Sequence, residues 1–202
     1  MTEPKRGRGR PREFDRDAAL EKALRVFWEL GYDAASVGEL TRAMGISSPS
    51  LYAAFGSKQQ LFTEALERYG QGAGSYTPRA LHSTGPARAA VEAMLRDNAD
   101  AYADGDTPAG CLVILAAPTC TRENAAANAD LRHRRQNTGR ALQRRIERAI
   151  ADGELPPGTD AAGLATFYLT VLHGLSIQAR DGADRALLHA AIDAALRAWP
   201  EQ

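Results

Sequence analysis

The stretch Ser36–Lys58, SVGELTRAMGISSPSLYAAFGSK, decides the fold. It predicts two short helices joined by a tight turn and followed by the start of a third. Ser36 and Glu39 have the spacing of a capping box, in which each side chain binds the backbone N–H of the other residue. Gly45 is placed to end the first helix in a left-handed C-cap, and Ser48-Pro49 starts the next, with serine as N-cap. A helix, a glycine turn and a short helix are typical of a helix-turn-helix, whose second helix commonly lies in the DNA major groove.

Composition places this stretch in an all-α protein. The chain has 202 residues, of which 44% are hydrophobic and only 6% aromatic, and alanine is very common while β-branched runs are few. There is no apolar run near the roughly 20 residues of a membrane span and no signal-peptide region. Two cysteines make no disulfide framework, so we expect a cytoplasmic protein that does not associate with membranes.

The sequence contains no recognisable catalytic motif, no glycine-rich phosphate loop and no cluster of metal ligands. We therefore expect a protein that is not an enzyme and that needs neither a cofactor nor a metal ion.

Charge is distributed unevenly, although 25 basic residues balance 25 acidic ones. Residues 1–12 are rich in arginine, glycine and proline, which predicts a disordered basic arm over 1–13. Its Arg8, Arg10 and Arg12 resemble an AT-hook, which lies in the minor groove of DNA; the alternative is a nonspecific phosphate-binding tail. A second basic run, Arg132–Arg135, is interpreted as the solvated face of a long helix.

Apolar periodicity and stop signals predict the remaining elements. The segment 111–117 is a buried strand or helix, its helical surroundings favouring helix, and 70–85 remains undecided. A basic arm over 1–13, a helix-turn-helix domain over 14–56 and a helical domain over 57–202 are expected. The predicted helices span residues 14–30, 36–44, 48–55, 57–69, 86–103, 128–151, 161–179 and 184–199.

Residues 14–69 resemble the Tet repressor (TetR/AcrR) family of bacterial transcription regulators. The resemblance implies an all-helical chain of about nine helices, a homodimer and an effector pocket in the C-terminal domain. The residues that carry it are Ala18, Ala23, Phe27, Gly31, Tyr32, Ser36, Val37, Leu40, Ala43, Gly45, Ile46, Ser47, Leu51, Tyr52, Phe55, Lys58, Leu61 and Phe62.

The same resemblance implies where DNA is contacted. Hydroxyl groups would reach bases or phosphates, Pro49 would touch a thymine methyl group, and Lys58 would bind a phosphate. Ala53 and Ala54 stand where the family often carries larger side chains, so we expect modest base readout, with the arginine arm supplying part of the specificity. The predicted contacts of the folded domain are Ser36, Thr41, Ser47, Ser48, Pro49, Ser50, Tyr52 and Lys58.

The last two predicted helices offer a dimer interface, because apolar and small residues recur on one face of each. The alternative is that both helices only close the core of the monomer. The predicted interface comprises Leu164, Phe167, Val171, Gly174, Leu175, Leu187, Leu188, Ala191 and Ala195.

Mostly apolar residues with a few polar groups are candidates for the effector pocket, although each is also an ordinary core residue. The leading hypothesis is a repressor that leaves double-stranded operator DNA when a small molecule binds there. One alternative is a thiol or metal sensor built on Cys111 and Cys120, and another is an architectural DNA-binding protein without an effector. The predicted pocket comprises Tyr102, Cys111, Ile114, Leu115, Cys120, Phe167, Tyr168 and His173.

Overall fold

The computed structural model describes residues 14–116 and 124–201, and these residues form ten helices, against the expected nine or so. The arm residues Arg8, Arg10 and Arg12 and the pocket candidate Cys120 lie outside the described residues. The all-α prediction is confirmed.

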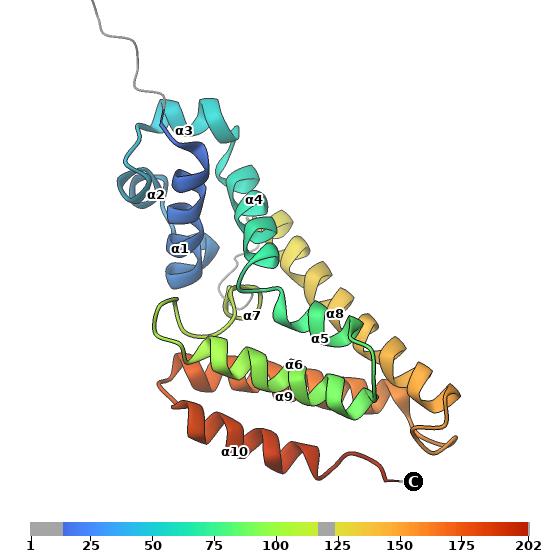
Figure 1. The fold of residues 1–202 in the computed structure, drawn as a ribbon. Coiled ribbons are helices and arrows are strands. Elements are labelled where there is room, and N and C mark those ends of the chain that lie inside the picture. The colour runs from blue at the N-terminus through green and yellow to red at the C-terminus, as the bar shows by residue number, and fades with distance from the viewer. Residues whose placement is uncertain (1–13, 117–123, 202) are drawn as a thin grey trace, which may run out of the picture.

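The first four helices make the helix-turn-helix unit and its support (Figure 1). Each begins at a side-chain N-cap: Asp15, Ser36, Ser47 and Ser57 accept bonds from backbone N–H groups of the following turn. The capping box predicted between Ser36 and Glu39 is present. The helices are α1 (Arg16–Ala34), α2 (Val37–Met44), α3 (Ser48–Phe55) and α4 (Lys58–Gln71).

Two details of these helix ends differ from the prediction. The N-cap of α3 is Ser47 rather than Ser48, because the Ser47 hydroxyl is the one that accepts from Ser50 N–H. Helical structure also continues past Gly31 to Ala34, with Gly31 itself in a non-helical conformation that kinks the end of α1.

An aromatic cluster holds the N-terminal helices together. Phe27 packs edge-on against Phe62 with ring centroids 4.9 Å apart, and Tyr32 lies 4.9 Å from the same ring. Leu112 and Leu131, from the next part of the chain, belong to the same hydrophobic cluster as α1–α4. The N-terminal core is therefore continuous with the next part of the chain, and the domain boundary expected after residue 56 stays a prediction.

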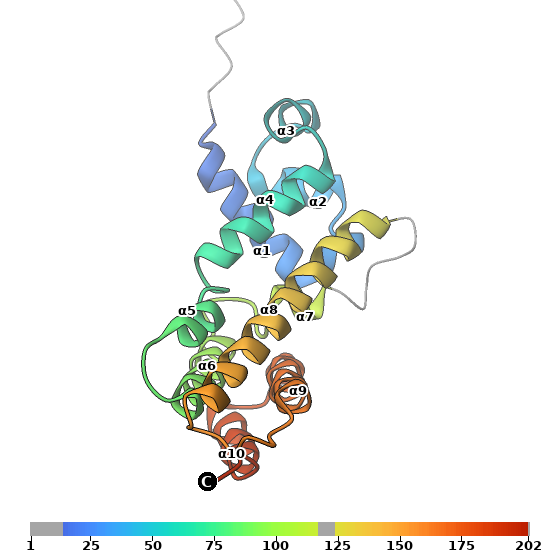
Figure 2. The ribbon, with the colours of Figure 1, turned by 90° about the vertical axis from the view of Figure 1, so that its right-hand side faces the viewer.

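The remaining helices are α5 (Tyr76–His82), α6 (Ala87–Tyr102), α7 (Leu112–Leu115), α8 (Ala125–Ala151), α9 (Ala161–Arg180) and α10 (Arg185–Leu196). The undecided segment 70–85 thus contains the end of α4 and the short α5, and the apolar segment near 112 is helical. The long helix α8 runs from beside α4 towards the far end of the molecule, and α6, α9 and α10 lie together below it (Figures 1 and 2).

The loop before α7 is hydrogen-bonded both to α1 in the N-terminal part of the chain and to α9 in the C-terminal part. The indole N–H of Trp28 in α1 donates to the Gly110 carbonyl at 3.0 Å, and Cys111 N–H donates to the Ser176 hydroxyl of α9 at 2.8 Å. None of the described helices is long and apolar enough to cross a membrane.

Candidate DNA-binding surface and effector cavity

Helix α3 lies at the end of the molecule opposite α10 (Figure 1) and presents a polar face. Leu51 and Phe55 are buried in the core, whereas Ser48, Pro49 and Tyr52 are exposed, with Tyr52 48% accessible. A tyrosine that exposed on a short helix has its hydroxyl available to an external partner, which weakens the alternative that Tyr52 is a core aromatic.

Other predicted DNA contacts already have intramolecular partners. The hydroxyls of Ser47 and Ser50 lie 2.8 Å apart and bind each other. Ser36 accepts from Glu39 N–H at 3.1 Å, and Thr41 donates to the Val37 carbonyl at 2.9 Å. These groups can meet DNA only by sharing or exchanging those bonds; Ser36 and Ser47 cap helices, and Thr41 bonds back to its own helix.

Lys58 is held against the core at the start of α4. Its ammonium group lies 4.5 Å from the centroid of the Tyr32 ring and donates to the Asp33 carbonyl at 3.5 Å. The side chain is half-buried, and its charge is thereby placed at a helix N-terminus, where anions are favoured.

Arg16 was missed at the sequence level, yet it fixes the end of α3. Its guanidinium lies 4.4 Å from the centroid of Phe55, donates to the Ala54 carbonyl at 3.3 Å and pairs with Glu64 at 2.7 Å. It thus joins α1, α3 and α4, which sets how the exposed face of α3 is presented. Arginine at this position has no local sequence signal, because its partners lie at least 38 positions away, on α3 and α4.

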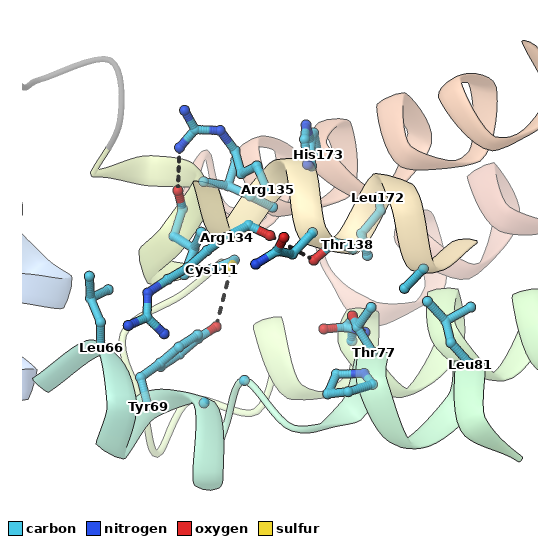
Figure 3. A pocket seen from close by; sticks show the side chains of 18 of the residues that line it. Leu66, Tyr69, Thr77, Leu81, Cys111, Arg134, Arg135, Thr138, Leu172 and His173 are labelled. Atoms are coloured by element: carbon cyan, nitrogen blue, oxygen red, sulfur yellow. Dashed lines mark hydrogen bonds between the residues drawn. The ribbon is translucent and has the colours of Figure 1, made fainter. Parts of the chain in front are cut away.

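A cavity of about 380 Å³ lies between α4, α5, α6, α8 and α9, with Cys111 and two residues of α7 in its wall (Figure 3). Its volume falls in the range of about 300–1,000 Å³ that is usual for small-molecule sites. The lining residues are Leu66, Tyr69, Gly70, Gly74, Thr77, Pro78, Leu81, His82, Asn98, Tyr102, Cys111, Val113, Ile114, Arg134, Arg135, Asn137, Thr138, Ala141, Arg144, Leu172 and His173.

Four of the predicted pocket residues line this cavity: Tyr102, Cys111, Ile114 and His173. Three do not, and that part of the prediction is wrong for this cavity. Leu115 is absent from its wall. Tyr168 points into the core, where its hydroxyl donates to the Ala195 carbonyl at 3.2 Å, and Phe167 is 40% exposed on the outer face of α9. Apolar character alone could not distinguish the two faces of α9.

The basic run of α8 is also placed differently from the prediction. Arg132 and His133 are exposed as expected, but Arg134 and Arg135 are half-buried and line the cavity. Arg134, Thr138 and Ala141 follow the i, i+4, i+7 spacing of one helical face, which is the signal that could have identified them.

Cys111 is a half-buried thiol rather than a reactive thiolate. Its sulfur accepts a hydrogen bond from the Tyr69 hydroxyl at 3.2 Å, and burial raises the pKa of the Cys111 thiol above its ordinary value. Within 14–116 and 124–201, no three His, Cys, Asp or Glu side chains gather in a way that could hold a metal ion. The raised pKa favours the neutral thiol over the thiolate at Cys111.

Tyr69 connects this cavity to the helix-turn-helix unit. Its ring packs edge-on against Trp28 of α1 at 4.9 Å between centroids, and the same residue also lines the cavity. Burial raises the pKa of Tyr69 well above that of an ordinary tyrosine, so the hydroxyl is always a hydrogen-bond donor. Leu66, one turn earlier, likewise belongs to both the N-terminal core and the cavity wall.

The structure buries some of the predicted dimer-interface residues and leaves the others exposed. Leu175, Leu188 and Ala195 are only 3%, 1% and 8% exposed, because they close the monomer's own core, and they are not surface residues. The remaining predicted residues are exposed or half-exposed: Leu164, Phe167, Val171, Gly174, Leu187 and Ala191. Ile177, 48% exposed, is an apolar residue of α9 that the prediction missed.

Comparison with known proteins identifies the family. The family "Bacterial regulatory proteins, tetR family" matches residues 19–65, and "Tetracyclin repressor-like, C-terminal domain" matches residues 87–195. The chain is 36% identical to the HTH-type transcriptional repressor ComR of Escherichia coli over 98% of this chain and 94% of ComR. It is 31% identical to the repressor BdcR of the same organism over 86% of this chain and 83% of BdcR.

A solved structure extends the likeness to the whole fold. A cysteine mutant of the TetR family transcriptional regulator CifR, complexed with 26-bp double-strand operator DNA, is 49% identical and superposes with a TM-score of 0.90, covering 95% of this chain and 100% of CifR. The expectation of a helix-turn-helix regulator rather than an enzyme is confirmed, and the chain belongs to the TetR family of bacterial transcription regulators.

Proposed function

We propose that this protein is a homodimeric repressor that binds double-stranded operator DNA through α3 and leaves it when a small molecule enters the cavity. The observation that carries the proposal is that one helix, α4, both packs against the helix-turn-helix unit and lines the cavity. The repressor names of ComR and BdcR and the operator complex of CifR support it.

On the DNA side, contacts to phosphate dominate. The exposed face of α3 carries Ser48, Pro49 and Tyr52, with Lys58 at the start of α4, and has no bidentate base-reading side chain. Arg8, Arg10 and Arg12 of the arm complete the proposed interface. Affinity should therefore depend strongly on salt, because each neutralised phosphate releases condensed counterions.

Dimerisation is proposed through the exposed apolar face of α9 and α10. Phe167, Ile177 and Leu187 are 40%, 48% and 59% exposed, so α9 and α10 leave large apolar side chains available to a partner. Gly174 leaves open space around its Cα, so a partner helix can approach closely there. Two copies joined in this way would present two α3 helices, which must lie about 34–36 Å apart to enter successive major grooves.

Ligand binding and DNA binding would be coupled through α4, because this helix both lines the cavity and packs against the helix-turn-helix unit. A ligand that displaces Leu66 or Tyr69 must move α4, and Tyr69 cannot shift without disturbing Trp28. The ligand then favours a conformation in which the two α3 helices are wrongly spaced, and operator DNA must weaken the ligand by the same factor.

The experiment is a reciprocal titration. Operator duplexes of 26 bp are first selected from a random library with the purified protein. The affinity of a cavity ligand is then measured by calorimetry with and without saturating operator. Weaker ligand binding in the presence of operator supports the proposal, whereas equal affinity in both states excludes it and leaves an effector-free architectural protein.

The thiol-sensing alternative is tested by measuring operator binding before and after alkylation of the cysteines. Cys111→Ser and Cys120→Ser variants that respond to ligands as the wild type does would remove the thiols from the mechanism.

A further inference from the structure

We infer that the effector is a small organic anion with an apolar body, whose acidic group binds at Arg134 and Arg135. This inference rests on the proposed function, because it assigns a chemical class to the ligand of the same cavity.

The first argument is the charge of the wall. Among the described residues that line the cavity there are three arginines and two histidines but no aspartate or glutamate. Arg144 and His82 are exposed, whereas Arg134 and Arg135 are half-buried. A cavity walled only by cationic and neutral groups favours an anionic guest, and partial burial strengthens that preference.

The second argument is that both guanidinium groups are held in place. Nε of Arg134 pairs with Asp130 at 2.9 Å, and the Nη1 group of Arg135 donates to the Val113 carbonyl at 3.0 Å (Figure 3). The ion pair uses only Nε of Arg134, so its terminal N–H groups remain as donors for a ligand. Fixed guanidinium donors suit the planar oxygens of a carboxylate and the similar geometry of other oxyanions.

His173, another residue of the cavity wall, lies near the positive charge of Arg135. Burial, followed by the nearby charge of Arg135, lowers the pKa of His173 below its ordinary value. The imidazole is therefore neutral at pH 7, and it can donate a hydrogen bond to an oxyanion without adding a further buried charge.

The third argument is that another part of the wall carries apolar side chains. Leu81 and Leu172 line it on the side of α5 and α9 in Figure 3, away from the Arg134 guanidinium, which lies beside Tyr69 and Leu66. An inorganic ion would leave these side chains without a partner. The combination of basic and apolar lining thus selects an amphipathic anion.

The test uses two fluorescent probes that share an aromatic body and differ in charge. 8-Anilinonaphthalene-1-sulfonate carries a sulfonate, and N-phenyl-1-naphthylamine is its uncharged counterpart. Dissociation constants for both are measured with the full-length wild type and with Arg134→Gln, Asp130→Asn and Arg132→Gln. Arg132 is the matched control, because it belongs to the same basic run but is exposed and does not line the cavity.

Removing the cavity charge in Arg134→Gln should weaken the sulfonate probe about tenfold, the lower end of what a charge-assisted hydrogen bond contributes, and leave the neutral probe unchanged. Asp130→Asn should strengthen the sulfonate probe, because it removes the carboxylate that offsets Arg134. Arg132→Gln should alter neither probe by more than about twofold.

Equal binding of the two probes by the wild type would overturn the inference, and so would an Arg134→Gln variant that binds the sulfonate normally. Operator affinity without a probe is measured for every variant as a check on folding and DNA binding. If the sulfonate binds as expected but fails to release operator, the anion assignment stands and the proposed release mechanism fails.

Discussion

Gly110 is the residue whose substitution tests the junction between the two halves most directly. Its φ of +81° lies in the left-handed region, and a Cβ placed there would stand 2.6 Å from the Ser176 carbonyl oxygen and 2.8 Å from Leu115 Cδ1. The nearest obstacle is backbone of α9, which cannot rotate out of the way. Gly110→Ala therefore combines backbone strain with a steric clash.

The loss of unfolding free energy expected for Gly110→Ala is the sum of two contributions. A left-handed conformation costs a non-glycine residue about 1–2 kcal/mol. Overpacking a filled interior costs a further 1–3 kcal/mol or so, which brings the expected loss of unfolding free energy to roughly 2–5 kcal/mol.

Gly105 supplies the control. Its φ is +80°, almost the same as at Gly110, but a Cβ there meets nothing within 4 Å. Gly105→Ala should therefore lose only the backbone term, about 1–2 kcal/mol. The difference between the two variants isolates the clash with Ser176.

The assay is urea unfolding followed by circular dichroism at equal protein concentrations, because dimerisation would make stability depend on concentration. For a chain of this size each kcal/mol should lower the melting temperature by about 2–4 °C. If Gly110→Ala and Gly105→Ala lost the same stability within about 0.5 kcal/mol, the close approach of the loop to α9 would be refuted.

Three further outcomes are expected. Tyr52→Phe and Lys58→Ala should both weaken operator binding, and Lys58→Ala should reduce the slope of log affinity against log salt by about one; an unchanged slope in fluorescence anisotropy would take Lys58 out of the interface. Leu187→Glu should shift the protein towards monomer in sedimentation velocity without unfolding it, because Leu187 is 59% exposed, and a persistent dimer would place the interface elsewhere. The lowered pKa of His173 means that the unfolded chain, with a histidine pKa of about 6.5, binds protons more readily than the folded one. Stability should thus be fully present above that pH and decline as the pH falls from about 6.5 towards the lower folded pKa, and His173→Gln should flatten this decline in pH-dependent melting curves.

The local features of the helix-turn-helix could be predicted from the sequence, because they depend on neighbours in the chain. The capping box of Ser36 and Glu39 was predicted correctly, as was the left-handed cap at Gly45, whose φ is +73°. The error at the start of α3 was a single residue, between two adjacent serines that can both cap a helix.

The candidate sites were predicted less completely, because periodicity identifies an apolar face but not what covers it. Leu188 and Leu187 are adjacent and chemically identical, yet one is 1% and the other 59% exposed. On α9, Tyr168 and Phe167 were assigned to the pocket but do not line it, whereas the predicted His173 does, together with Leu172, which was not predicted.

By itself, then, the sequence determined the helical class, the DNA-reading unit and the family, since caps, turns and short-range periodicity are properties of consecutive residues. Only the tertiary structure decided that Arg134 and Arg135 face a cavity, that Tyr69 joins this cavity to Trp28, and that Arg16 fixes α3. The cavity wall brings together residues that are far apart in the sequence, such as Tyr69 of α4 and Arg135 of α8, which are 66 positions apart. Those same contacts carry the proposed regulation of DNA binding.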